Sequence, residues 1–421
     1  MCGIFGIVSS SVVDRKDLGV LVTCSQMRGK DSSGLILAQN DEYNIHRADY
    51  PITQLLKEVD LRPAKLVMGH SRLITNGLAD NQPVVRDNVF VIHNGIIVNH
   101  ESVWDLIDKE RQLQIDTEVI AAIASDMLAK GEKLEEIPKR ILELCVGVVA
   151  CALVIPQLSK LCLFSNNGSL YCGRKNGDVY FASESYPLDK VGCTSVEQIK
   201  EAVFVDISHS DAPAKVVDRN GRTTNLIPSL PLISSEEKLL DYRKHDLKRC
   251  RKCILPETVP FISFDAEDIC NFCRNYKLRN IPRPKEELFD LVEPYRRKRG
   301  NDCIVPFSGG RDSCYGLHLV VNELKMKPVT YTYDWGMVTD LGRRNISRMC
   351  AKLGVENIIV ADDITKKRKY IELNLRAWLK SPHLGMVSIL TAGDKHFFRH
   401  IETIKRQTSI GLNLWGVNPL E

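Results

Sequence analysis

The first 208 residues contain nine short apolar segments rich in β-branched side chains, and this pattern limits the fold more than any other feature of the chain. Segments of this length and composition are typical of strands. Two longer segments, DTEVIAAIASDMLAK and KLEEIPKRILELC, have the periodicity of amphipathic helices. Many strands beside a few helices predict an α+β domain made of packed layers.

From residue 301 the pattern changes to strands that alternate with a glycine-rich loop and a helix. The strand-like DCIVPF is followed by SGGRDS, by the helical CYGLHLVVNELK and by the strand-like PVTYTY. This βαβ order is typical of a parallel sheet in an α/β domain. Between the two patterns, HSDAPAKVVDRNGRTTNLIPSLPLISS is rich in turn-forming residues. The sequence therefore predicts four parts: a first domain over 1–208, a linker over 209–248, a cysteine module over 249–280 and a second domain over 281–421.

The chain has 421 residues, of which 44% are hydrophobic and 26% are charged. This composition excludes a largely disordered chain and a small disulfide scaffold. No apolar run is long enough to span a bilayer, and the first residues lack the basic and apolar regions of a signal peptide. We therefore expect a cytoplasmic protein without a membrane span, in which the 14 cysteines are reduced thiols, metal ligands or nucleophiles.

The charges are divided unevenly along the chain. Residues 1–240 contain 25 Lys and Arg against 31 Asp and Glu, whereas residues 241–421 contain 32 against 22. A basic second half favours an anionic ligand there, such as a nucleotide, pyrophosphate, an acidic sugar or RNA.

Cys2 directly follows the initiator methionine. The small side chain of cysteine permits removal of Met1, which would leave Cys2 with a free α-amine. An α-amine titrates near pH ~8, so it can take the thiol proton at neutral pH. Cys2 is therefore a candidate nucleophile that carries its own base.

Four motifs follow Cys2 along the chain: RGKDSSG, GHSRL, HNG and DTE, at residues 28–34, 69–73, 93–95 and 116–118. Together with MCGIFG at the amino terminus, this set resembles the glutaminase domain of class II glutamine amidotransferases. The resemblance covers roughly residues 2–208 and implies an amino-terminal-nucleophile hydrolase with a four-layer αββα fold.

The same resemblance implies a role for individual residues. Cys2 would attack the carboxamide carbon of glutamine to give a glutamyl thioester and ammonia. The Asn94 side chain and the Gly95 backbone N–H would form an oxyanion hole of preorganised donors. Arg72 would bind the glutamine α-carboxylate through its planar guanidinium, and Asp116 would bind the α-ammonium group.

Two CxxC pairs lie close together in the cysteine module. Each pair places two thiolates on one tight turn, and two such turns can close a tetrahedral zinc site with four cysteine ligands. Sulfur would occupy all four positions, so this zinc would be structural. An iron–sulfur cluster and free thiols are the alternatives. The predicted ligands are Cys250, Cys253, Cys270 and Cys273.

The loop SGGRDS follows a predicted strand and opens a predicted helix. Its glycines let backbone N–H groups approach an anion, and the helix amino terminus attracts negative charge. Its aspartate is unlike a Walker loop and is better explained as a Mg²⁺ ligand. SGGxDS after a strand resembles the pyrophosphate loop (PP-loop) of ATP pyrophosphatases, which cleave ATP to AMP and pyrophosphate. The predicted residues for ATP and Mg²⁺ are Ser308, Gly309, Gly310, Arg311, Asp312 and Ser313.

The PP-loop resemblance implies an adenine nucleotide α-hydrolase-like fold, a doubly wound parallel sheet with ATP at the carboxyl ends of its strands. Asp334 closes the next predicted strand and is expected to border the adenine pocket.

The whole segment 249–421 resembles the N-acetyl sugar amidotransferases of surface-polysaccharide synthesis, through CRKCILPETVPFISFDAEDICNFC, PFSGGRDS, TYDWG, SPHLG and LWGVNP. The resemblance implies that the acceptor is an acidic or nucleotide-linked N-acetyl sugar whose acetamido group becomes an acetamidino group. A further helical segment is expected after the last residues, NPLE, so the chain is predicted to be truncated there.

A glutaminase domain that releases ammonia, followed by a PP-loop domain that activates a carbonyl group, predicts a glutamine-dependent, AMP-forming amidotransferase. Asparagine synthetase is organised in the same way, with two active sites. The alternatives are asparagine synthetase-type amidation of a carboxylate, tRNA modification by a PP-loop enzyme, and a non-enzymatic scaffold. The four-cysteine module argues against the first. The tRNA-thiolating enzymes need no glutaminase, so no nucleic acid partner is expected. The sequence leaves open whether the chain forms a homo-oligomer.

Overall fold

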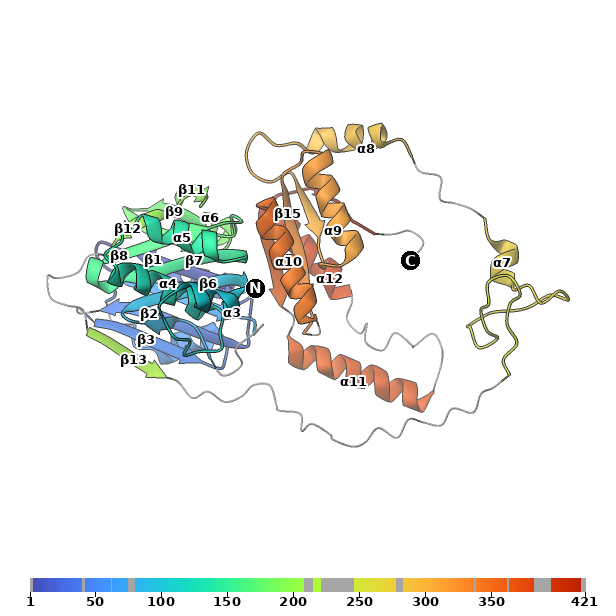
Figure 1. Ribbon diagram of the computed structural model, residues 1–421, viewed down its shortest axis with the longest axis horizontal. Coiled ribbons are helices and arrows are strands. Elements are labelled where there is room, and N and C mark those ends of the chain that lie inside the picture. Colours follow the sequence, from blue (N-terminus) through green and yellow to red (C-terminus); the bar gives the residue numbers. More distant parts are fainter. Residues whose placement is uncertain are drawn as a thin grey trace. The chain divides into compact units, whose positions relative to one another are not determined.

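The structure is a computed structural model that describes residues 3–39, 42–61, 63–74, 80–207, 215–220, 246–277, 283–336, 338–361, 363–381 and 395–417. The chain divides into two units (Figure 1). The first unit consists of Met1–Ile227, Tyr295–Ile364 and Lys395–Glu421, and the second consists of Pro228–Pro294 and Thr365–Asp394.

The first unit contains an eight-stranded sheet in the order β11-β9-β10-β1-β4-β2-β3-β13. Neighbouring strands are antiparallel except β13, which runs parallel to β3. The strands are β1 (Gly3–Val8), β2 (Ser32–Gln39), β3 (Glu42–Ala48), β4 (Leu66–Arg72), β9 (Tyr171–Lys175), β10 (Asp178–Ala182), β11 (Thr194–Gln198) and β13 (Lys215–Asn220). Since β13 lies within 209–248, part of the expected linker belongs to this sheet.

A second, five-stranded antiparallel sheet in the first unit has the order β12-β8-β7-β6-β5. Its strands are β5 (Val84–Arg86), β6 (Val89–Ile97), β7 (Gly147–Ile155), β8 (Lys160–Ser165) and β12 (Val203–Asp206).

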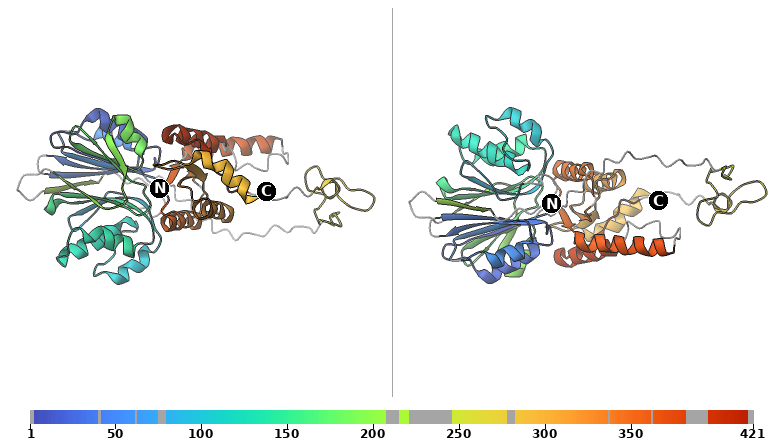
Figure 2. Two further views of the ribbon diagram at one scale, coloured as in Figure 1. Left: turned by 90° about the horizontal axis from the view of Figure 1, so that it is seen from above. Right: turned by 90° about the horizontal axis from the view of Figure 1, so that it is seen from below.

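The two sheets pack face to face, and helices cover their outer faces (Figure 2). Alternation along β1 shows the principle: Ile4 and Val8 enter the apolar layer between the sheets, whereas Phe5 and Ile7 pack toward the helices. The expected four-layer αββα arrangement is therefore confirmed. The helices of these layers are α1 (Arg15–Ser25), α2 (Ile52–Glu58), α3 (His100–Val103), η1 (Trp104–Leu106), α4 (Thr117–Ala129), α5 (Glu136–Leu144), η2 (Pro156–Leu158) and α6 (Ser185–Val191).

A four-stranded parallel sheet completes the first unit, as the βαβ pattern predicts. Its order is β16-β15-β14-β17, so the order of the strands reverses beside β14, the first of them along the chain. Its elements are β14 (Cys303–Pro306), α9 (Arg311–His318), the π-helix η4 (Leu319–Glu323), β15 (Pro328–Asp334), α10 (Asp340–Leu353), β16 (Asn357–Ala361), α12 (Lys395–Thr408) and β17 (Leu412–Asn413).

The second unit contains the cysteine module and few regular elements. These are α7 (Asn271–Asn275), α8 (Lys285–Val292) and most of α11 (Ile364–Lys380), and η3 (Glu293–Tyr295) lies at the junction with the first unit. Within the described residues, no helix combines the length and apolarity that crossing a membrane requires.

Glu356, just before β16, is a buried carboxyl group where the parallel sheet meets the sandwich. The Tyr171 hydroxyl donates to its Oε2 at 2.6 Å, and the Asn301 amide donates to the same atom at 3.3 Å. Burial raises the pKa of Glu356 to about 7, although Tyr171 and Arg28 act against this shift. The folded state therefore binds this proton more tightly than the unfolded state does.

We predict that Glu356→Gln stabilises the protein at pH 8 and leaves its stability nearly unchanged at pH 4. The stabilisation that protonated Glu356 gives the folded state is fully present below the pKa of this residue in the unfolded chain. As pH rises through about 7 it is lost, and the free energy of unfolding falls by up to about 3 kcal/mol. Thermal unfolding of both proteins across this pH range checks the prediction. Glu201→Gln, at an exposed position, is the control. Parallel pH profiles of Tm for wild type and Glu356→Gln would contradict it.

Candidate active site

The apolar layer between the two sheets of the sandwich becomes polar at one end. On β4, Met68 belongs to this layer, and His70 and Arg72 follow on the same face because side chains alternate along a strand. On β6, Ile92 belongs to the layer and Asn94 follows. His70, Arg72 and Asn94 are at most 2% exposed. Buried polar groups of this kind require partners from the protein or from a ligand.

Ser183, which sequence reasoning missed, connects the two sheets at this polar end. Its hydroxyl accepts from the Ile4 backbone N–H at 2.9 Å and from Asn94 Nδ2 at 3.4 Å. Its own N–H donates to the Ile4 carbonyl at 3.0 Å. The start of β1 therefore lies next to the predicted oxyanion residue Asn94.

Cys2, the predicted nucleophile, lies outside the described residues. Its neighbour Gly3 begins β1, and a Cβ on Gly3 would come within 2.5 Å of Ser25 Oγ. The position after Cys2 therefore requires glycine.

Asn94 and Gly95 lie in β6 opposite Ala150 and Val149 of β7. A Cβ on Gly95 would lie 1.8 Å from the Val148 carbonyl oxygen, so only glycine fits this close approach. Asn94 Oδ1 has no hydrogen-bond partner among the described residues. The site therefore contains the buried amide of Asn94 next to Gly95, where any larger residue would push β6 and β7 apart.

Arg72 and Asp116, predicted to bind the two charged groups of glutamine, are 2% and 3% exposed, so neither is a surface charge. The Arg72 guanidinium donates to the Asp80 carbonyl. Asp116 immediately precedes α4, and its Oδ2 accepts from the Ile97 N–H at 2.8 Å. Both residues are thus held by backbone groups near the polar end of the sandwich.

The two buried histidines of this region are kept neutral. Burial lowers the pKa of His70 well below its usual range, and the charge of Arg72 acts in the same direction. Burial also lowers the pKa of His93, whose Nε2 lies 3.1 Å from the Val148 carbonyl oxygen. His93 is fixed by the backbone, whereas neither ring nitrogen of His70 has a partner among the described residues.

The predicted phosphate loop follows β14, where the strand order of the parallel sheet reverses. This reversal opens the crevice in which doubly wound sheets bind their ligands. Gly309 has a φ of +75°, and its Cβ would come within 2.8 Å of the Gly342 carbonyl oxygen. Ser308 Oγ lies 3.1 Å from Ser313 Oγ. Glycine is thus required for the turn that brings these hydroxyls to the start of α9.

The two charged residues of the loop point more toward solvent. The Arg311 side chain is 87% exposed, and its Nε lies 3.1 Å from Oδ1 of Asp312, whose side chain is 37% exposed. The Asp312 carboxylate is therefore accessible at the amino-terminal end of α9.

Asp334 ends β15 at the same edge of the sheet as the loop. Both Nε and Nη2 of Arg343 donate to its Oδ2 at 3.0 Å, and the Gly336 N–H donates to its Oδ1 at 2.9 Å. Sequence reasoning missed Arg343, because the pairing depends on how α10 packs. Asp334 is therefore held in place by an arginine at the predicted nucleotide edge.

Asp31 interacts with residues of both predicted sites. Its Oδ2 accepts from the Ile74 N–H at 2.9 Å, and its own N–H donates to the Arg72 carbonyl. Burial raises the pKa of Asp31, the charge of Asp334 adds to this effect, and Arg72 and Arg343 oppose it. Asp31 is thus within electrostatic reach of both the polar end of the sandwich and the carboxyl edge of β15.

The four predicted metal ligands come together in the second unit. Their sulfur atoms all lie within 4.8 Å of one another. Burial opposes ionisation of Cys250, but the N–H groups of Cys253, Cys270 and Lys252 outweigh it and lower the pKa of Cys250 to about 6. Four converging sulfurs, one of them stabilised as a thiolate, fit a tetrahedral metal site, and the cluster could bind a zinc ion.

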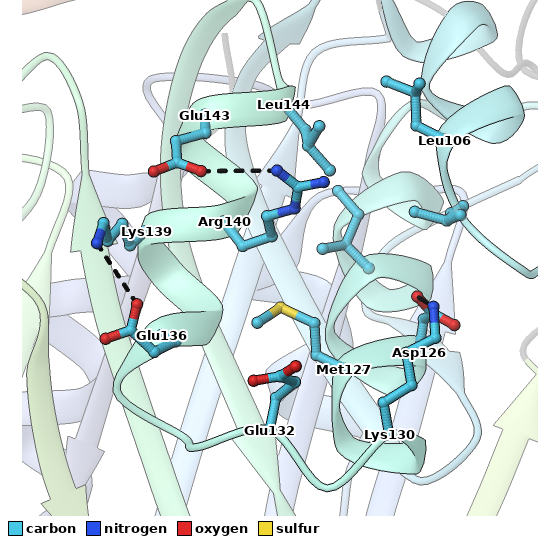
Figure 3. Close-up of a pocket in the computed structure, with 12 residues that line it drawn as sticks. Leu106, Asp126, Met127, Lys130, Glu132, Glu136, Lys139, Arg140, Glu143 and Leu144 are labelled. Atoms are coloured by element: carbon cyan, nitrogen blue, oxygen red, sulfur yellow. Dashed lines mark hydrogen bonds and ion pairs between the residues drawn. The ribbon is translucent and has the colours of Figure 1, made fainter.

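A surface pocket between α4 and α5 is drawn in Figure 3, and none of the predicted site residues lines it. Six of its seven charged side chains are paired with one another: Lys130 with Asp126 at 2.6 Å, Lys139 with Glu136 at 3.5 Å and Arg140 with Glu143 at 3.6 Å. We interpret it as a solvated groove between two helices.

Comparisons with known proteins identify the amino-terminal part of the chain. The family described as "Glutamine amidotransferase domain" matches residues 70–190. The glutamine–fructose-6-phosphate aminotransferase of Mesorhizobium japonicum is 30% identical over 45% of this chain and 32% of its own length. That of Bradyrhizobium diazoefficiens is 26% identical over 52% of this chain and 37% of its own length. The chain thus spans about a third of the length of these curated relatives.

Two solved structures are similar in part. The Bacillus subtilis glutamine phosphoribosylpyrophosphate amidotransferase, complexed with ADP and GMP, is 22% identical over 50% of each chain, with a TM-score of 0.41. A structure described as the allosteric regulatory enzyme of purine biosynthesis is 15% identical over 86% of this chain and 80% of its own, with a TM-score of 0.42. Scores this low support no detailed comparison. The family match, the distant sequence relatives and the sandwich together identify a class II glutamine amidotransferase domain in the amino-terminal part of this chain.

Proposed function

We propose that this chain is a glutamine-dependent amidotransferase that uses ATP, with release of AMP and pyrophosphate, to activate a carbonyl group of its acceptor. One observation carries the proposal: the parallel-sheet part that bears the glycine-rich loop is hydrogen-bonded to the glutaminase sandwich, since Ser347 Oγ of α10 donates to the Ile96 carbonyl oxygen and accepts from the Val148 N–H, each at 2.8 Å. Because both parts belong to one unit of the fold, ammonia would need only a short path from the glutaminase site to the ATP site.

In the glutaminase half, Cys2 attacks the carboxamide carbon of glutamine and its amine takes up the thiol proton. The oxygen that becomes negative is stabilised by the Asn94 amide and the Gly95 N–H. The α-ammonium of Cys2 then gives its proton to the leaving nitrogen, the C–N bond breaks, and ammonia departs to leave a thioester. Water then releases glutamate. The burial of Arg72 and Asp116 supports their assignment to the carboxylate and ammonium groups of glutamine, since buried charges need oppositely charged partners.

In the second half, the loop 308–313 binds the phosphates of ATP through its backbone N–H groups and the two serine hydroxyls. The accessible Asp312 carboxylate suits a hard, oxygen-preferring cation and would hold Mg²⁺. The carbonyl oxygen of the acceptor attacks the α-phosphorus and pyrophosphate leaves. Ammonia then adds to the activated carbon and AMP leaves. We assign the adenine pocket to the edge at Asp334 and the whole domain to the PP-loop fold.

The acceptor is proposed from the resemblance of 249–421 to N-acetyl sugar amidotransferases. With an N-acetyl group as acceptor, the product is an amidine in which NH replaces the oxygen. The relatives named for fructose-6-phosphate match about half of this chain and about a third of their own length, so their acceptor does not transfer to this protein. Mass spectrometry of free and nucleotide-linked N-acetyl sugars, incubated with protein, glutamine and ATP, tests this assignment through the mass change from O to NH.

We predict that Cys2→Ala abolishes glutamine hydrolysis, because the proposed mechanism forms the thioester on the Cys2 thiol. ATP-dependent turnover of the acceptor with added ammonium salt should survive. Glutamate and pyrophosphate release, measured separately, check the two halves, and Cys24→Ala is the control for a thiol outside the site. Loss of both activities in Cys2→Ala with an unchanged Tm would contradict the two-site mechanism.

We expect Asp312→Asn to lower AMP formation by about 10²-fold or more, because a neutral amide binds Mg²⁺ poorly at an electrostatically stabilised transition state. Basal glutaminase activity should stay at the wild-type level. Asp290→Asn, at an exposed position of α8, is the matched control. An Asp312→Asn protein that forms AMP at the wild-type rate would rule out this role for the carboxylate.

Metal analysis of the purified chain is expected to give about one zinc per protein, as for a closed site with four thiolate ligands. Cys253→Ser should reduce the zinc content sharply and destabilise the second unit, because three thiolates remain. Cys193→Ser, which removes a thiol from outside the cluster, should keep the full zinc content. Iron and sulfide in place of zinc, or no metal in either protein, would refute the zinc assignment.

A further inference from the structure

Ser347 of α10 joins the parallel-sheet part of the first unit to the strands that carry the oxyanion residues. Its side chain is buried, with 1% of the residue exposed. Its hydroxyl donates to the Ile96 carbonyl oxygen at 2.8 Å and accepts from the Val148 N–H at 2.8 Å. Since Ile96 and Val148 are paired in β6 and β7, one hydroxyl holds both members of a cross-strand pair.

The peptide groups that Ser347 holds are in direct contact with the oxyanion segment. Ile96 follows Gly95 in β6. The carbonyl oxygen of Val148 presses on Gly95, where it would lie 1.8 Å from an added Cβ, and it also contacts His93 Nε2. A shift of Val148 would therefore move the Gly95 N–H and the Asn94 peptide next to it.

The strand pair has room for the hydroxyl because of Gly147. This residue has a φ of +121°, and its Cβ would lie 2.2 Å from the Ile96 carbonyl oxygen and 2.9 Å from Ser347 Oγ. A hydroxyl is suited to this place because it donates to one strand and accepts from the other. Alanine at position 347 would leave a buried N–H and a buried carbonyl without these hydrogen bonds.

We propose that Ser347 is a positioning residue for the oxyanion hole, so that a helix encoded some 250 residues after the oxyanion motif sets the position of the Gly95 N–H. This inference rests on the oxyanion roles proposed for Asn94 and Gly95. Ser347 itself touches neither residue's donor group and acts through Ile96 and Val148.

Cys350 provides a matched control for simple packing of α10. It is buried like Ser347 and lies on the same helix, but its Sγ contacts Thr330 Oγ1 of β15 at 3.5 Å. Cys350→Ala therefore removes a buried polar atom from α10 on the side of the parallel sheet.

The test is steady-state glutamine hydrolysis by the full-length chain and its variants. Ser347→Ala should lower kcat about tenfold, because small displacements of a catalytic donor are costly. Its KM should change by less than about twofold, since glutamine binding does not use the oxyanion donors. Ser347→Thr, which keeps the hydroxyl, should restore most of kcat, and Cys350→Ala should have the wild-type kcat.

Several outcomes would overturn the inference: a wild-type kcat in Ser347→Ala, or an equal loss of kcat in Ser347→Ala and Cys350→Ala. If Ser347→Ala does not fold, Ser347→Cys is measured in its place, since cysteine is nearly isosteric with serine but a weak hydrogen-bond donor. A wild-type kcat in Ser347→Cys would then overturn the inference, as would a loss equal to that in Cys350→Ala. Asn94→Ala separates this inference from the proposed function. A loss of kcat in Asn94→Ala beside a normal kcat in Ser347→Ala overturns the role of Ser347 alone, whereas a normal kcat in Asn94→Ala overturns the oxyanion assignment itself.

Discussion

Both faces of both sheets in the sandwich are covered, and the rest of the first unit depends on this constraint. Successive side chains of each strand point alternately into the layer between the sheets and into the layer under the helices. Whether a residue has an odd or an even position in its strand therefore decides its surroundings. Apolar side chains fill the middle of the inner layer, as Ile4 and Met68 show. Polar side chains at its end, such as Arg72 and Asn94, are then buried in surroundings of low polarisability, where fixed donors would act strongly on a substrate.

The groups at that end are held in place before any substrate arrives. Backbone carbonyls and N–H groups hold Arg72 and Asp116, Ser183 links Asn94 to the start of β1, and His70 and His93 are kept uncharged by burial. Such preorganisation reduces the reorganisation needed in the transition state. Glycine is required at Gly95 because the Val148 carbonyl oxygen of the neighbouring strand occupies the place of a Cβ.

The parallel-sheet part contributes to this arrangement as well as carrying its own loop. Through α10, Arg343 holds Asp334 at the edge proposed for the nucleotide, Asn345 Nδ2 lies 3.4 Å from the Gly309 carbonyl oxygen, and Ser347 holds the β6–β7 pair. One helix therefore contacts the loop proposed for ATP and the strands proposed for the oxyanion. A rigid element of this kind ties the geometry of the two sites together.

The sequence by itself determined a layered α+β domain, the parallel sheet, the cysteine cluster and the position of the glycine-rich loop, because each depends on local periodicity or short spacing. The αββα order of the layers came from the resemblance of its motifs to a known family. The sequence also indicated Asn94, Gly95, Arg72 and Asp116 through motifs. Only the tertiary structure decided the partners of these residues: Ser183, Arg343, Ser347 and the raised pKa of Glu356 all arise from contacts between elements distant in the chain, and β13 joins a sheet from a stretch that reads as linker. Such contacts depend on how preformed layers pack, and no local signal in the sequence encodes that packing.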